Sequence, residues 1–227
     1  MFFKTPRNDD LDRSLKRLIS DNPDLSVIDI GANKGQTLEK FRRLGHRGKY
    51  LAVEPIPELA LMIEKKFKKK AADLTVISAA VTSSEIKTVI LNLYPERLEL
   101  TSLYNLTEKG AVDYGITTQS QIEVNTIDIN YLVHEVEHPV LLKIDTQGSD
   151  FDILKKLTTE SRQKIDAILV EIPINPIYDT SHDWLDYCTL LHSFDFEPNA
   201  IKPVSRNGRN QLIEIDLLAV KRKKTLS

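Results

Sequence analysis

The sequence predicts an α/β fold: a seven-stranded, mostly parallel sheet with an antiparallel last strand and helices on both faces. Three observations support this prediction. Apolar runs of strand length alternate with helical patterns between residues 24 and 81, and the alternation returns between residues 139 and 194. The last two strands are joined by "PVSRNGRN", a short glycine-bearing connection that suits an antiparallel hairpin better than a crossover.

The first part of the chain reads as β-α-β-α-β, the order of a parallel sheet with right-handed crossovers. Its first strand, "DLSVIDIG", is rich in β-branched residues and closes on a glycine. The helix that follows places Leu38, Phe41 and Leu44 on one face. Pro57 opens the second helix, because proline is tolerated in a first turn. We expect strands at 24–31, 49–55 and 74–81, and helices at 34–45 and 57–70.

The rest of the chain is less regular at first and then regains the α/β rhythm. Between residues 85 and 127, two strand-like runs enclose a polar, glycine-containing stretch. After it we expect strands at 139–145, 165–172, 196–202 and 211–221, and helices at 150–157 and 182–194. We expect residues 1–23 to form a helical extension and residues 24–227 a single domain with an irregular insert at 85–127.

The composition is that of an ordinary globular protein. With 31 basic and 33 acidic residues the net charge is −2, so no global field favours nucleic acid or a membrane surface. The single cysteine, Cys188, excludes an internal disulfide and fits a reducing compartment. The first residues show no signal-peptide pattern, and no window has the apolar length of a membrane span. We therefore expect a cytoplasmic protein.

The most informative stretch is "VIDIGANKGQT" at 27–37, a strand that feeds a glycine-bearing turn and so brings backbone close to a nucleotide-like ligand. Asp29, Gly31 and Gly35 form a D-x-G-x-x-x-G pattern, with Asn33 where a dinucleotide fingerprint has its middle glycine. A carboxylate that faces the ligand from the strand end would repel a pyrophosphate and attract a sulfonium. The loop therefore favours S-adenosylmethionine over NAD.

Glu54 ends the second predicted strand, 19 residues after Gly35. An acid at this place can accept hydrogen bonds from both ribose hydroxyls of an adenosine. Because both cofactors contain that ribose, Glu54 supports a nucleoside ligand and leaves the choice between them to the first loop.

Five segments together resemble the FkbM-type S-adenosylmethionine-dependent methyltransferases: "VIDIGANKGQT", "VEPIP", "ISAAV", "LLKIDTQGSDFDILK" and "ILVEI". The resemblance covers residues 25–221, and its most distinctive part is the I-D-x-Q-G element at Asp145, Gln147 and Gly148. It implies a class I methyltransferase, with a Rossmann-like fold, and methyl transfer to oxygen, often on sugars or polyketide-type products. Asp150 stands where the family commonly has the longer glutamate, so a role that depends on the reach of that glutamate is not carried over to it.

Carried over by position, the resemblance implies a cofactor site with S-adenosylhomocysteine as product. "TSLY" at 101–104 matches a stretch where the family has paired serines, at Ser102 only. The expected cofactor-binding residues are Asp29, Gly31, Ala32, Asn33, Gly35, Glu54, Pro55, Ala79, Ala80, Ser102, Asp145 and Gln147.

Methyl transfer to an alcohol requires an in-line acceptor and the loss of its proton, so a general base near the strand ends helps. Asp145 and Glu171 are the expected catalytic residues, because each ends a predicted strand. For Asp145 the alternative is a helix N-cap or turn acid, and for Glu171 a structural acid. His134 and His138 lie four residues apart but Pro139 follows at once, and we expect no metal site.

Three other functions stay open. The sequence "NPIY" at 175–178 resembles the turn that holds a flipped adenine in amino-methyltransferases, but it follows the fifth strand and lacks the second proline. An NAD-dependent oxidoreductase is disfavoured by Asp29 and Asn33. A non-catalytic nucleoside-binding scaffold would keep the same loop.

The acceptor is expected to be a saccharide or another small hydroxylated molecule. By strand order, residues 85–127 and 173–184 should shape its pocket. These two segments contain Tyr94, Tyr104, Tyr114, Tyr178 and Trp184.

Overall fold

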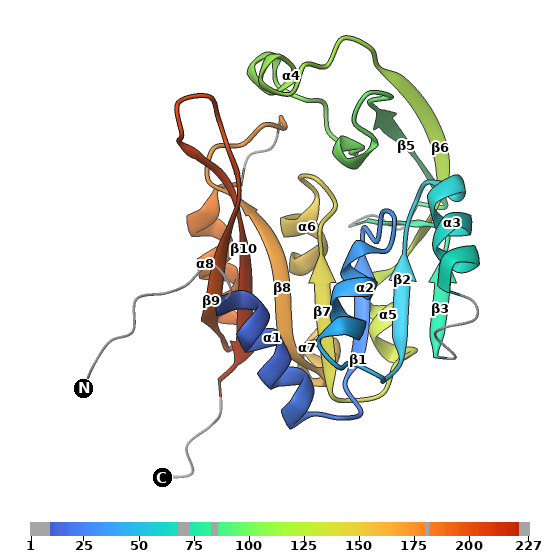
Figure 1. Ribbon diagram of the computed structural model, residues 1–227, viewed down its shortest axis with the longest axis vertical. Helices are drawn as coiled ribbons and strands as arrows, with labels where there is room; N and C mark the ends of the chain where they lie inside the picture. Colours follow the sequence, from blue (N-terminus) through green and yellow to red (C-terminus); the bar gives the residue numbers. More distant parts are fainter. Residues whose placement is uncertain (1–9, 68–72, 83–85, 180–181, 223–227) are drawn as a thin grey trace.

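The structure, a computed structural model, describes residues 10–67, 73–82, 86–179 and 182–222. Within them a seven-stranded sheet has the order β3-β2-β1-β7-β8-β10-β9 (Figure 1). β10 is antiparallel to β8 and β9, and the other neighbouring strands are parallel, so the predicted sheet is confirmed. The strands are β1 (Ser26–Ile30), β2 (Tyr50–Val53), β3 (Leu74–Ile77), β7 (Val140–Ile144), β8 (Ile165–Pro173), β9 (Phe196–Arg206) and β10 (Leu212–Lys221).

A second sheet lies above the carboxyl ends of β1, β2 and β3 and has the order β4-β6-β5 (Figure 1). Its strands are β4 (Ala80–Val81), β5 (Thr88–Leu93) and β6 (Ser120–Ile127). The predicted strand 74–81 is therefore wrong as one unit, because residues 74–77 pair with β2 and residues 80–81 pair with β6. The apolar pattern continues through this break, and only the hydrogen-bonding partner changes.

Helices cover both faces of the large sheet, as predicted (Figure 1). α3 ends at Phe67, and residues 68–70 of the predicted helix lie outside the described residues. Three short helices, α4, α5 and α7, were not expected from the sequence. The helices are α1 (Asp10–Asp21), α2 (Gln36–Arg43), α3 (Pro57–Phe67), α4 (Glu108–Tyr114), α5 (Ile129–His134), α6 (Asp150–Lys155), α7 (Thr159–Lys164) and α8 (Trp184–Ser193), with a 3₁₀ turn η1 at Leu98–Leu100.

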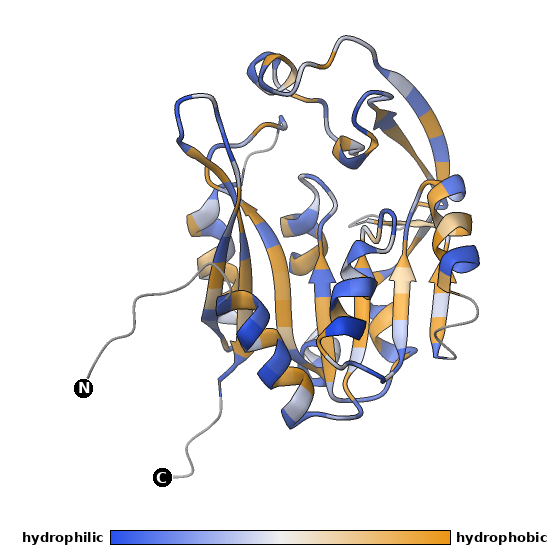
Figure 2. Ribbon diagram, viewed as in Figure 1, coloured by the Kyte–Doolittle hydropathy of each residue, from blue (hydrophilic) through white to orange (hydrophobic). Residues whose placement is uncertain are grey.

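The sheet separates two main apolar clusters, because successive side chains of a strand point to opposite faces. Ile28 and Ile30 of β1 pack on the face covered by α5, α6 and α8. Val27 packs on the other face, with α1, α2 and α3. Figure 2 shows the hydrophobic residues concentrated along the central strands. By the same alternation Asp29 shares the face of Val27, which decides where its carboxylate lies.

The N-terminal helix α1 belongs to this second cluster, where Leu11, Leu15 and Ile19 are buried. Residues 1–9 lie outside the described residues, and the division of the chain at residue 24 stays a prediction. None of the helices in the described part of the chain combines the length and apolar character that crossing a membrane requires.

Candidate functional site

A cavity of about 300 Å³ opens at the carboxyl ends of the parallel strands, beneath the segment that contains η1. Ten of the thirteen predicted site residues line it: Gly31, Asn33, Glu54, Pro55, Ala79, Ala80, Ser102, Asp145, Gln147 and Glu171. Asp29, Ala32 and Gly35 do not. The topology explains the grouping, because parallel strands end at the same edge of the sheet and present their following loops there.

The loop after β1 touches the end of β7. A Cβ built on Gly31 would lie 1.8 Å from the carbonyl oxygen of Asp145, and Gly31 has a φ of +74°. Only glycine tolerates both this approach and the left-handed conformation. Asn33 follows with a φ of +50°, and its backbone N–H donates to Glu54 Oε2 at 2.8 Å. The first loop is thereby tied to the ends of both β7 and β2.

Glu54 is 4% exposed, and its two carboxylate oxygens accept backbone N–H bonds from Asn33 and Ile56, at 2.8 and 3.0 Å. Burial raises the pKa of Glu54 to about 7, against the opposing effect of these two hydrogen bonds. Nearby, Asn33 Oδ1 is buried and has no hydrogen-bond partner within the described residues. Both groups are at the cavity wall, where a ligand with hydroxyl or ammonium hydrogens can donate to them.

Asp29 does not face the cavity, so the expected contact between its carboxylate and a ligand is wrong. Its side chain is fully buried and accepts a 2.7 Å hydrogen bond from the Tyr50 hydroxyl. Lys143 Nζ lies 3.1 Å from its Oδ1, an ion pair without the alignment of a hydrogen bond. Asp29 is the second-to-last residue of β1, so the strand alternation directs it to the face that α1, α2 and α3 cover.

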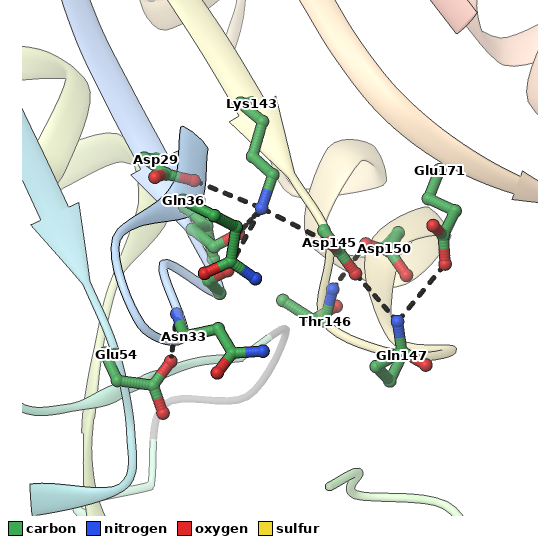
Figure 3. A network of polar contacts seen from close by, with 12 residues as sticks. Asp29, Asn33, Gln36, Glu54, Lys143, Asp145, Thr146, Gln147, Asp150 and Glu171 are labelled. Carbon is green, nitrogen blue, oxygen red and sulfur yellow. Dashed lines mark hydrogen bonds and ion pairs between the residues drawn. The ribbon is translucent and has the colours of Figure 1, made fainter. Parts of the chain in front are cut away.

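Lys143 was not expected from the sequence to belong to the site. It lies directly opposite Asp29 in the β1–β7 register, and its ammonium is buried between that carboxylate and Asp145, whose Oδ2 is 3.4 Å away (Figure 3). The only available signal was its position, a lysine inside the apolar strand "VLLKI", two residues before Asp145. A lysine in a fully buried strand requires anionic partners.

Asp145, Gln147 and Glu171 form a network at the cavity (Figure 3). Gln147 Nε2 donates to Asp145 Oδ1 at 2.8 Å and to Glu171 Oε1 at 3.2 Å. Gln147 Oε1 accepts from the Tyr178 hydroxyl at 2.7 Å. The Gln147 amide therefore binds both predicted catalytic carboxyl groups, and the hydrogen bond from Tyr178 sets the orientation of that amide.

Asp145 is not a helix N-cap, so that alternative for it is wrong. Ser149 occupies the cap position of α6. The turn acid is Asp150, whose carboxylate accepts from the backbone N–H groups of Thr146 and Gly148 at 2.8 and 3.1 Å. Burial and the charge of Asp145 raise the pKa of Asp150 to about 6. The shorter acid at 150 thus closes the I-D-x-Q-G turn, while Asp145 faces the cavity.

The end of the cavity that Asp145 and Glu171 line is rich in carboxyl groups. Burial and the neighbouring carboxylates of Asp145, Glu214 and Asp216 raise the pKa of Glu171 well above its ordinary value. Burial likewise raises the pKa of Glu214, which comes from β10. The described residues contain no group of three or more His, Cys, Asp or Glu side chains that could hold a metal ion.

The walls around this end differ in part from the prediction. Ser102 Oγ donates to the Gln147 carbonyl at 2.5 Å, so the 85–127 insert is fastened to the I-D-x-Q-G turn. Among the five expected aromatic residues, Tyr114 alone lines the cavity. The Tyr178 hydroxyl instead donates a hydrogen bond to Gln147, and Trp184 is on the surface of α8. The β9–β10 hairpin supplies Val204, Ser205 and Glu214 instead, which strand order alone did not indicate.

The chain is similar in sequence to known proteins. Residues 29–198, well over half of the chain, match the family described as the methyltransferase FkbM domain. A curated protein named Methyltransferase 1, from Beauveria bassiana (strain ARSEF 2860), is 23% identical over 192 residues, which cover 79% of this chain and 75% of that protein.

Two solved structures have a similar fold. The methyltransferase FkbM from Methylobacillus flagellatus KT has a TM-score of 0.51 and 14% identity, over 86% of this chain and 43% of that chain. A Listeria monocytogenes protein assigned as an S-adenosylmethionine-dependent methyltransferase has a TM-score of 0.51 and 11% identity, over 93% and 97%. At these identities the likeness is one of fold, the class I methyltransferase fold.

Proposed function

The chain belongs to the FkbM methyltransferase domain family, and from this premise we propose that it transfers a methyl group from S-adenosylmethionine to a hydroxyl oxygen of a saccharide or another small molecule. One observation supports this above the others. A single cavity joins the tight first loop and Glu54 to Asp145 and Glu171, so a nucleoside end and an acid–base end lie in one space. The proposed cytoplasmic location rests on the sequence alone.

The residues at the nucleoside end suit S-adenosylmethionine. Glu54 would accept hydrogen bonds from the ribose, and Asn33 Oδ1, which lacks a partner in the described chain, would accept one from a ligand N–H or O–H group. Ala79 and Ala80 give a small apolar wall for the adenine. Asp145 faces the cavity, so its carboxylate, and not that of Asp29, would attract the sulfonium. Bound S-adenosylmethionine would supply an electrophilic methyl group on a sulfonium.

The acid–base end would orient the acceptor and take its proton. Asp145 keeps a cationic neighbour in Lys143 and is the better candidate base, receiving the hydroxyl proton on a carboxylate oxygen as the acceptor oxygen gains the methyl group. The raised pKa of Glu171 favours its protonated form, which suits a hydrogen-bond donor to the acceptor. Since carboxyl groups dominate this end, neutral hydroxylated acceptors suit it better than phosphorylated or carboxylated ones.

Calorimetry with three ligands tests the proposal. We expect S-adenosylmethionine and S-adenosylhomocysteine to bind and NAD not to bind, because the cavity offers carboxylates where a pyrophosphate would lie. Binding of NAD alone would indicate an oxidoreductase, and binding of neither cofactor would indicate a protein without a nucleoside site. A mass-spectrometric screen of sugars, lipid-linked acceptors and adenine-containing oligonucleotides with labelled donor then separates O-methylation, adenine methylation and a scaffold without turnover.

A pH dependence of binding should identify Glu54. Ribose hydroxyls that donate to its carboxylate favour the ionised form, so binding lowers the pKa of Glu54 from about 7. By linkage, affinity for S-adenosylhomocysteine should rise with pH through this value, by up to about tenfold between pH 6 and pH 8. Titration calorimetry at the two pH values measures the rise. The Glu54→Gln variant should bind more weakly and lose this rise; an equal rise in that variant would assign the titration to another group.

A further inference from the structure

We propose that Lys143 is a positioning residue of the cofactor site, which locks the first loop to Asp145 while Asp29 serves as its buried counter-ion. This inference rests on the proposed function. It concerns a residue that does not line the cavity and that would act through two neighbours that do, Gly31 and Asp145.

Lys143 contacts both the first loop, at Gly31, and the carboxylate of Asp145. Its Nζ donates to the carbonyl oxygen of Gly31 at 3.0 Å and to that of Ile30 at 3.4 Å. The same atom lies 3.4 Å from Asp145 Oδ2. The backbone repeats this connection, since the Asp145 N–H donates to the Ile30 carbonyl at 3.1 Å. One ammonium thus contacts the last carbonyl of β1, the first carbonyl of the turn and the carboxylate opposite them.

The burial of Lys143 determines how strongly its charge interacts with the neighbouring carboxylates. The residue is 7% exposed and Asp29 is 0% exposed, so neither charge is screened by solvent. Asp145 has a side chain that is 33% exposed, toward the cavity that it lines. Asp29 therefore balances the charge of the lysine inside the sheet, and Lys143 can offer its hydrogens to the carbonyls and to Asp145.

A purely structural role and a positioning role make different predictions. If Lys143 only neutralises Asp29, removing both charges should leave a normal cofactor site. If Lys143 positions Gly31 and Asp145, removing both charges should restore stability without restoring affinity. Replacing a buried ion pair by neutral groups is often nearly neutral for stability, whereas leaving one buried charge alone is costly.

Four variants separate the two roles: Asp29→Asn, Lys143→Met, Lys143→Arg and the double variant D29N/K143M. Melting temperature and affinity for S-adenosylhomocysteine, a ligand without the sulfonium charge, are measured at pH 7.5. Calorimetry is run at 10 °C, with near-ultraviolet circular dichroism to show that each variant is folded. Lys143→Met should melt about 10 °C lower because Asp29 is left unpaired, and the double variant should recover most of this loss.

The affinities for S-adenosylhomocysteine distinguish the positioning role of Lys143 from a purely structural one. Asp29→Asn should bind S-adenosylhomocysteine within about twofold of the unaltered chain, and Lys143→Arg, which keeps a cationic donor, within about threefold. Lys143→Met and the double variant should both bind about tenfold more weakly, since hydrogen bonds from a charged donor to the loop are lost. Equal affinity of the double variant and the unaltered chain would overturn the proposal, as would an equal loss in Asp29→Asn. If the unaltered chain does not bind the ligand at all, the proposed function fails and this inference with it.

Discussion

The Gly31→Ala variant is expected to lose about 3 kcal/mol of stability and roughly 100-fold in affinity for S-adenosylhomocysteine. The added methyl group would lie 1.8 Å from the Asp145 carbonyl oxygen, and the residue must keep a φ of +74°. The left-handed conformation costs about 1 kcal/mol and overpacking against backbone costs about 1–3 kcal/mol. The loop must therefore move away from β7. Loss of two loop hydrogen bonds to the ligand would account for the affinity.

Thermal unfolding and calorimetry measure these two effects. A loss of about 3 kcal/mol corresponds to a melting temperature lower by roughly 6–12 °C for a chain of this size. Gly115→Ala is the matched control, because Gly115 has a φ of +67° and nothing within 4 Å of a Cβ. That control should lose about 1 kcal/mol and keep its affinity. If Gly31→Ala behaves like the control, the contact between the first loop and Asp145 has no part in binding.

The Asp145→Asn variant is expected to lower turnover by at least about 100-fold while its affinity for S-adenosylhomocysteine stays within a few-fold. An amide cannot take the acceptor's proton, and general-base catalysis contributes about 100-fold or more. The variant keeps the size of the side chain and one oxygen for Gln147 to donate to. Methyl transfer from labelled donor to the acceptor found in the screen measures turnover, and calorimetry measures affinity.

Two further variants complete this experiment. Asp152→Asn is the control, since Asp152 bonds to Tyr104 and does not line the cavity, and turnover should stay within about twofold. Glu171→Gln tests the other carboxyl group, and it should retain more turnover than Asp145→Asn, because glutamine can still donate a hydrogen bond to the acceptor. Near-normal turnover in Asp145→Asn together with a large loss in Glu171→Gln would transfer the role of base to Glu171.

The fold was predictable to a large extent because its signals are local. Strand-length apolar runs and the glycines at their ends predict the parallel strands, and the short connection "PVSRNGRN" predicts the antiparallel end. The break at Ser78 and Ala79 was not predictable, since residues 74–77 and 80–81 have the same apolar character and differ only in the strand that each one pairs with. The short helices α4, α5 and α7 have six or seven residues, too few to show a clear periodic pattern; α6 is as short, but it was predicted because it follows a predicted strand where the α/β rhythm returns.

By itself the sequence determined which residues meet at the carboxyl edge of the sheet, because chain order and strand direction bring the ends of β1, β2, β7 and β8 together. The tertiary structure alone decided which side chains face the cavity. Asp29 and Lys143 are opposite each other in the β1–β7 register and share the face that α1, α2 and α3 cover, so the carboxylate that lines the cavity is that of Asp145. The physical reason is that Asp29 and Lys143 lie inside their strands, where burying one charge requires a partner that only strand pairing can bring, whereas Asp145 follows the last residue of β7 and its carboxylate reaches the cavity.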